Sequence, residues 1–111
     1  MKIEQTKVSA SGIMFSIKKD GEEIGRAYLY LLYNGLHSEP FGLLEDVFVE
    51  EEHRGKGLGT KLVEAVISAA KQNNCYKLFG TSRHSRKKVH DWYKKLGFYD
   101  QGLEFRMDFK K

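Results

Sequence analysis

A glycine-rich segment in the middle of the chain has the residue types and spacing of a phosphate-binding loop. The apolar residues 47–49 and the charged residues 50–53 lead into Arg54-Gly55-Lys56-Gly57-Leu58-Gly59-Thr60. Glycines at alternate positions leave the backbone N–H groups unobstructed by side chains. If a helix begins here, its first N–H groups have no intrahelical acceptor and its dipole favours anions. The segment therefore predicts a phosphate cradle, with Arg54 and Lys56 adding positive charge.

The spacing of this loop excludes two common nucleotide motifs. No Gly-Lys-Ser/Thr ends the run, as a Walker loop requires. The three glycines at 55, 57 and 59 also differ from the dinucleotide fingerprint, whose last glycine comes one residue later. The remaining alternative is a glycine-rich turn that only packs tightly against a sheet.

Glu45 interrupts the otherwise nearly apolar residues 41–49 and is the candidate for handling a proton. A carboxylate in such a strand is expected to be buried, and burial disfavours its charged form, as suits a general base. The alternatives are that Glu45 binds a cationic amine or pairs with an arginine. Asp46 is expected on the opposite face of the strand and is the weaker candidate.

The first half of the chain has the pattern of β-strands that would position this loop. Residues 12–17 alternate and end at Asp20-Gly21, and residues 23–33 end at Asn34-Gly35, both typical of turns. Residues 41–49 are apolar enough for a central strand. Residues 2–8 are expected to add a short leading strand.

In the second half the apolar period becomes helical. Residues 57–73 predict an amphipathic helix closed by Asn73-Asn74, and residues 76–81 a strand. Ser85 is expected to cap a second helix that stops at Gly97, and residues 103–109 alternate like a final strand. The expected fold is α/β (α+β): one domain over residues 1–111, with a mixed, mostly antiparallel sheet of about six strands flanked by two helices.

The amino-acid composition excludes several classes of protein. The chain has 111 residues, one cysteine, and 19 basic against 15 acidic residues, a formal charge of +4. A single cysteine excludes an intramolecular disulfide framework. The four histidines show no metal-ligand spacing, so no metal is expected. No apolar run is long enough to cross a bilayer, and the modest charge is unlike that of a dedicated nucleic-acid binder. We expect a soluble cytoplasmic protein.

Two segments together resemble the GNAT superfamily of acetyl-CoA-dependent N-acetyltransferases. Arg54-Gly55-Lys56-Gly57-Leu58-Gly59 is similar to its Arg/Gln-x-x-Gly-x-Gly/Ala signature, and Trp92-Tyr93-Lys94-Lys95-Leu96-Gly97-Phe98 to its second diagnostic segment. Residues 44–49 resemble the family's fourth strand, and the sequence Glu-Asp-Val-Phe-Val at 45–49 is especially similar to the diamine and polyamine branch. The resemblance covers about residues 41–98 and implies acetyl transfer from acetyl-CoA, as co-substrate, to a primary amine by direct attack on the thioester.

The resemblance also implies roles for individual residues. The pyrophosphate would lie on the N–H groups of Gly55 to Thr60, and the pantetheine arm would pair with Val47, Phe48 and Val49, with the Val47 N–H facing the thioester oxygen. Tyr93 matches the usual general acid; packing beside Trp92 is the alternative. Arg86 and its basic neighbours would attract phosphates, or simply form a solvated helix surface. The implied acceptor is a small-molecule amine or a protein lysine or N-terminus.

Two departures from the family pattern concern the acceptor side and the second helix. The helices usually found between the first two strands have no room between Val8 and Gly12, so the acceptor side should be open or completed by another chain, and a homodimer is compatible with the short length. Arg86 stands where an asparagine is common.

Two further hypotheses compete with the enzyme. One is an acyl-CoA-binding or sensor module without turnover, which the presence of both Glu45 and Tyr93 disfavours. The other is a small basic nucleic-acid module using residues 83–88, for which no known signature is present.

Overall fold

The computed structural model describes residues 1–110, which fall into two compact units, Met1–Gly80 and Thr81–Lys111. The first unit contains β1 (Ala10–Lys19), β2 (Glu22–Leu32), β3 (Phe41–Val49), the short 3-10 helix η1 (Glu51–His53), α1 (Leu58–Gln72) and β4 (Leu78–Gly80). The second contains α2 (Lys87–Lys95).

The first unit is built on a four-stranded mixed sheet in the order β1-β2-β3-β4. The first three strands are antiparallel neighbours, and β4 runs parallel to β3. Asp20 and Gly21, which connect β1 to β2, have φ angles of +53° and +81°. Two consecutive positive φ angles are what a tight hairpin turn requires, so this turn matches the expectation from its Asp-Gly sequence.

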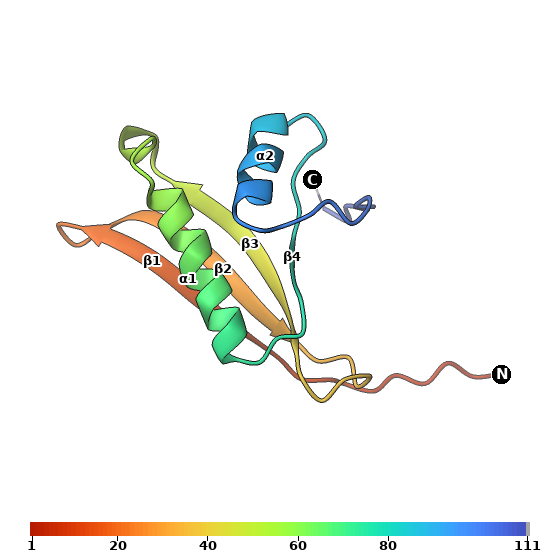
Figure 1. The fold of residues 1–111 in the computed structure, drawn as a ribbon. Coiled ribbons are helices and arrows are strands. Elements are labelled where there is room, and N and C mark those ends of the chain that lie inside the picture. The colour runs from red at the N-terminus through yellow and green to blue at the C-terminus, as the bar shows by residue number, and fades with distance from the viewer. Residues whose placement is uncertain (111) are drawn as a thin grey trace. The chain divides into compact units, whose positions relative to one another are not determined.

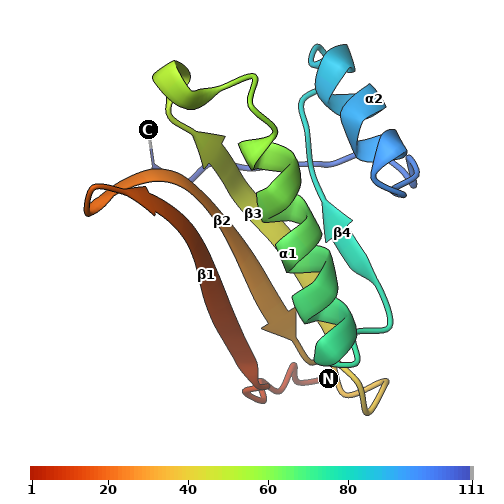
Figure 2. The ribbon, with the colours of Figure 1, turned by 60° about the vertical axis from the view of Figure 1, so that its left-hand side comes forward.

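One face of the sheet is covered by α1, as Figures 1 and 2 show from two sides. The helix buries Leu62, Val63, Val66 and Ala70, which recur at helical spacing. They meet the alternate residues Ala27, Leu29 and Leu31 of β2 and Leu44 of β3, and these side chains form the core. The helix ends at the predicted place, because Asn74 adopts a φ of +60° and the Cys75 N–H donates to the Ala70 carbonyl.

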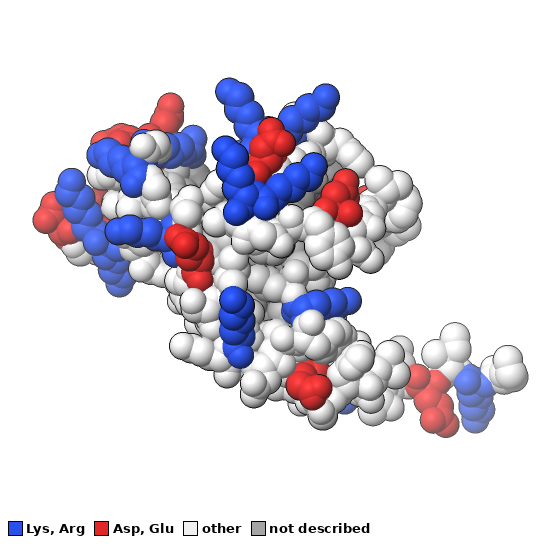
Figure 3. All heavy atoms as spheres, in the orientation of Figure 1, with Lys and Arg blue, Asp and Glu red and all other residues white. Residues whose placement is uncertain are grey.

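The second unit consists of turns, α2 and an irregular segment. Arg86 is the residue before α2, without a side-chain hydrogen bond to the helix, so the expectation that Ser85 caps it is wrong. The helix stops where predicted: Gly97 has a φ of +105°, and the Phe98 N–H donates to the Tyr93 carbonyl. Basic side chains gather over α2 in Figure 3.

The predicted α+β class with a mixed sheet and two helices is confirmed, with four strands in place of about six. Residues 2–8 and 103–109, the two remaining expected strands, form no regular structure. Alternation is insufficient here, because a strand also needs a neighbour to accept its backbone hydrogen bonds. Within residues 1–110 no helix is long and apolar enough to cross a membrane.

Candidate functional site: a glycine loop beside a bulged strand

The start of α1 carries no side-chain cap. Gly57 precedes the helix in a left-handed conformation (φ +81°), makes no side-chain cap and is followed by no acidic residue in the first turn. Gly55 has a φ of +80°, and a Cβ built on either glycine would meet nothing within 4 Å. The helix start is therefore electropositive, uncapped and sterically open, which suits a phosphate group.

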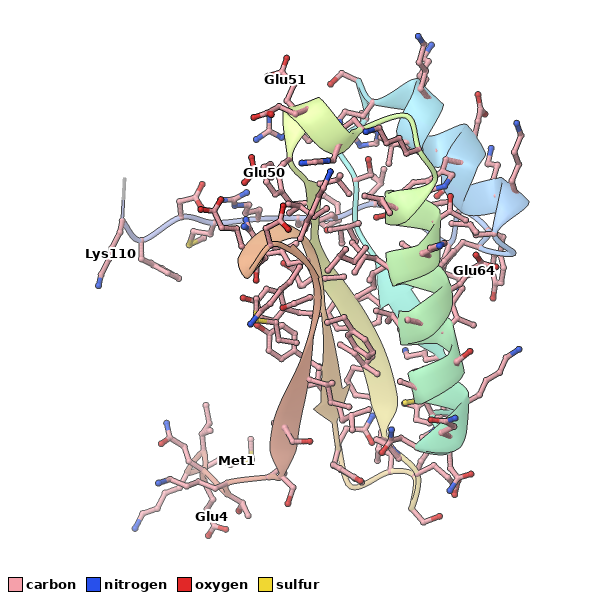
Figure 4. All side chains as sticks on the ribbon, turned by 90° about the vertical axis from the view of Figure 1, so that its left-hand side faces the viewer. Met1, Glu4, Glu50, Glu51, Glu64 and Lys110 are labelled. Carbon is pink, nitrogen blue, oxygen red and sulfur yellow. The ribbon has the colours of Figure 1, made fainter. Side chains whose placement is uncertain are left out.

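Arg54 ties this loop to the end of β3. Its Nε–H donates a hydrogen bond of 2.7 Å to the Val49 carbonyl, and its guanidinium lies 5.5 Å from the centre of the Phe48 ring. Glu50 and Glu51 lie beyond the end of β3, at the turn that precedes the loop (Figure 4). Arg54 thus holds the loop against the strand, in addition to contributing the positive charge predicted from the sequence.

A β-bulge interrupts β3 next to the loop. Glu45 pairs with Tyr28 and Phe48 with Arg26, so Asp46 and Val47 together face the single residue Ala27. Asp46 has a φ of +50°, a left-handed conformation that aspartate tolerates better than most residues. The bulge leaves Val47 outside the regular ladder with β2.

The other edge of β3 is open at the same place within the first unit. Leu44 is the last residue of β3 that pairs with β4, opposite Gly80. From Glu45 to Val49 the strand therefore has no neighbour on the β4 side within residues 1–80. An extended ligand that carries amide groups could pair with this edge as an added strand.

Two expectations about the carboxylates are wrong. Glu45 is exposed, so the burial argument does not apply to it, although its role as a base stays a prediction. Asp46 is not on the opposite face: its carboxylate accepts a 2.8 Å hydrogen bond from Arg26 Nε, and Arg26 shares the Tyr28 face of β2. The bulge causes this, because the extra residue breaks the alternation of side chains along the strand.

The Arg26–Asp46 pair uses one of the two carboxylates at the bulge. The hydrogen bond to Asp46 is the main factor that raises the pKa of Arg26. Glu45 has no hydrogen bond or ion pair within the first unit. Its carboxylate is therefore available to a ligand, whereas that of Asp46 is already neutralised.

The second unit contains the two remaining predicted site residues. Tyr93 is in α2, its ring 5.2 Å from that of Trp92 and 5.3 Å from that of Phe98. Arg86 is the residue before α2, at the end of the basic turn. Tyr93 therefore does pack beside Trp92, which was the alternative to its role as general acid. Ring packing of this kind is compatible with a hydroxyl group that also donates a proton.

Within the first unit the fold joins Arg54 to the Val49 end of β3, and the glycine loop continues directly from Arg54. Glu45 lies on the same strand, before the bulge. Sequence reasoning missed the bulge and the Arg26–Asp46 pair. The only signal for them was Asp46 itself, a turn-forming residue in an apolar strand. Among residues 1–110 no group of three or more His, Cys, Asp or Glu side chains is arranged to hold a metal ion.

A family model described as "Acetyltransferase (GNAT) family" matches residues 2–98. An aminoglycoside N(6')-acetyltransferase type 1 from Stenotrophomonas maltophilia is 31% identical over 95% of this chain and 72% of its own length. The chain belongs to the GNAT acetyltransferase family. The family and the name of this relative confirm the enzyme class predicted from the sequence, which is an N-acetyltransferase.

Other relatives differ in the acceptor that their names give. A thialysine N-epsilon-acetyltransferase from Bos taurus is 37% identical over 51% of this chain, a match that spans about a third of that protein (34%). The solved structure of a putative acetyltransferase from Agrobacterium tumefaciens superimposes with a TM-score of 0.81 at 26% identity, covering 87% of this chain and 68% of the other. The aminoglycoside acetyltransferase is matched over most of its length, but this chain spans less than two thirds of the length of the glucosamine 6-phosphate and thialysine acetyltransferases that it resembles.

Proposed function

We propose that the protein transfers the acetyl group of acetyl-CoA to a primary amine by direct attack of the amine on the thioester. The observation that carries the proposal is the start of α1, where Gly55 and Gly57 leave an open, uncapped set of backbone donors. This donor set fits a pyrophosphate, because both left-handed glycines allow close approach and no nearby carboxylate competes in the first turn.

The open edge of β3 supports the position proposed for the pantetheine arm. Amide groups of the arm would pair with the backbone of Val47, Phe48 and Val49, where β4 no longer does. The remaining donors of the loop, from Gly55 and Lys56 through Leu58, Gly59 and Thr60, would hold the phosphates. By resemblance to the family, the Val47 N–H would donate to the thioester oxygen, and the bulge frees that residue from regular pairing.

Two side chains are proposed to handle protons. Glu45 is exposed and unpaired within the first unit, so it can accept a proton from an ammonium directly or through water, or hold the cation in place. Tyr93 would donate its phenolic proton to the departing thiolate, as the matching tyrosine does in the family. Arg86, which precedes α2 in the second unit, would attract the phosphates of the co-substrate.

The acceptor we propose is a small molecule rather than a protein lysine or N-terminus. Relatives are named for aminoglycoside, glucosamine 6-phosphate and thialysine, and all of these are small amines. We further propose that the chain acts as a single catalytic domain in the cytoplasm, as a homodimer where the acceptor side needs a second copy.

An acetylation screen tests this proposal and separates it from the sensor alternative. Thiol release from acetyl-CoA is measured with polyamines, amino acids, aminoglycosides and a lysine peptide. Release with a small amine, and its loss in Tyr93→Phe, supports the enzyme. Tight CoA binding without release for any acceptor supports a sensor module. Salt-dependent oligonucleotide binding without CoA binding would instead support the nucleic-acid module.

A further inference from the structure

The face of the sheet that α1 does not cover is apolar. Within residues 1–80 the only helix besides the short η1 is α1, and it lies on the other side of the sheet (Figure 4). Alternate residues of all four strands form the apolar face, which we call the uncovered face: Met14, Tyr28, Tyr30, Phe41, Leu43 and Phe79. A sheet face that meets water normally carries polar residues at such positions. The uncovered face is therefore expected to have a partner.

Side chains on three of the four strands of this face are accessible. Met14 is 46% exposed, Phe79 39% and Tyr30 37% with all the described residues present. Tyr30 pairs with Leu43 across β2 and β3, and Leu43 pairs with Phe79 across β3 and β4. Tyr30, Leu43 and Phe79 therefore form one apolar row across the middle of the uncovered face, which we call the central row.

Two charges of opposite sign lie on either side of the central row. Glu45 is two residues beyond Leu43 on β3, and Lys77 is two residues before Phe79, just ahead of β4. Because β3 and β4 are parallel, the rise of a strand places each charge about 7 Å from the row, in opposite directions. The Lys77 Nζ lies 5.2 Å from the centre of the Phe41 ring and 5.8 Å from that of Phe79, so the ammonium is on the uncovered face. Within residues 1–110 neither Glu45 nor Lys77 forms an ion pair.

We propose that the uncovered face binds the same face of a second copy of the chain, with the two-fold axis parallel to the central row. A rotation about this axis stacks one sheet on the other with its strands reversed, so Leu43 meets Leu43, and Glu45 of each copy lies near Lys77 of the other. A two-fold interface is isologous, so this ion pair forms twice. Both side chains are long enough to meet across the ~10 Å between stacked sheets. A two-fold axis along β3 would instead place the two copies of Glu45 opposite each other, which is unfavourable.

This dimer would place a second copy beside the proposed acceptor site. Because no helix lies over the uncovered face within residues 1–80, the acceptor side is open there in a single copy. In the dimer, Lys77 of the second copy would border it at Glu45. The location of the acceptor at Glu45 rests on the proposed function, whereas the interface rests on the apolar face and its two charges alone.

The experiment measures self-association of the full chain by sedimentation equilibrium and exchanges the two charges. We expect the unmodified protein to be a dimer. Glu45→Lys and Lys77→Glu should each raise the dimer dissociation constant about 5- to 30-fold, because each change turns both ion pairs into like-charge contacts. The double variant, which exchanges the two charges, should restore most of the affinity, and a damaged fold could not produce this recovery. Glu64→Lys is the matched control, because it makes the same charge change on the exposed side of α1 (Figure 4) and should leave the dimer intact.

Three results would overturn the interface. They are an unmodified protein that stays monomeric up to its highest soluble concentration, a dimer that both single variants leave unchanged, and a double variant that associates no more tightly than the single ones. Thiol release, measured on the same unmodified protein, keeps this inference apart from the proposed function. A dimer that responds to the charge exchange but releases no thiol supports the interface and refutes the acetyl transfer, and thiol release by a monomer does the reverse.

Discussion

The sharpest test of the phosphate cradle replaces Gly57 by alanine and uses Gly35→Ala as its control. The two glycines have nearly the same φ, +81° and +78°, and a Cβ on either meets nothing within 4 Å. Both substitutions force an L-residue into a left-handed conformation, which costs about 1–2 kcal/mol of folding free energy. Their melting temperatures should therefore fall by similar amounts.

The two variants should differ in their affinity for CoA. The Cβ at position 57 projects into the space beside the uncapped helix start, where only a ligand would meet it. Loss of even one charge-assisted hydrogen bond to a phosphate costs about 1.5–3 kcal/mol, which corresponds to about a 10- to 150-fold rise in Kd. Gly35 is in the β2–β3 connection, so Gly35→Ala should bind normally. Calorimetry on both proteins checks this, and equal CoA affinities would refute the cradle.

Four other predictions follow from the same structure. Tyr93→Phe keeps the ring packing and should lower kcat about 100-fold or more with CoA affinity retained, measured by thiol release; normal turnover would remove the phenol from the mechanism. Glu45→Gln should lose most activity at low pH and recover partly as pH rises if Glu45 is the base, whereas a raised acceptor Michaelis constant at unchanged kcat would indicate a cation binder. Burial raises the pKa of the Cys75 thiol, so at pH 8 alkylation of the folded chain should be slower than that of a free cysteine, and an equal rate would contradict this. Leu29→Ala, at a fully buried site, should cost about 2–5 kcal/mol of unfolding free energy in urea titrations, and a smaller loss would mean that the core collapses around the cavity.

Hydrophobic periodicity predicted the elements whose partners are close in sequence. Residues 41–49 were expected as a strand and form β3 with the same bounds. The first helix was expected over residues 57–73 and runs from Leu58 to Gln72. These segments bury a continuous apolar stripe, so the local pattern and the tertiary packing favour the same structure.

The expectations that failed depend on what a segment meets rather than on its own pattern. Residues 103–109 alternate correctly, yet Phe105 is 89% exposed in an irregular segment. Ser85 has the right side chain for a cap, but the turn that precedes α2 is closed one residue later, at Arg86. At the site, the glycine loop follows from composition and position. Asp46 was misjudged because a single extra residue changes which side chains share a face, and Glu45 because it lies on the face of the sheet that α1 does not cover.

The bulge in β3 gives this strand one more residue than β2 has over the same stretch. Before it, odd-numbered residues such as Leu43 and Glu45 share the face of Tyr30 and Tyr28, and after it the even-numbered Phe48 does. Deletion of Asp46 would leave Val47 alone opposite Ala27, with Phe48 still opposite Arg26 and Val49 still opposite Gly25, so the residues after the bulge would keep their faces. The extra residue therefore serves the site rather than the register of the sheet. A chain without Asp46 should keep its core, but Val47 would enter the regular ladder with β2 and Arg26 would lose its carboxylate partner.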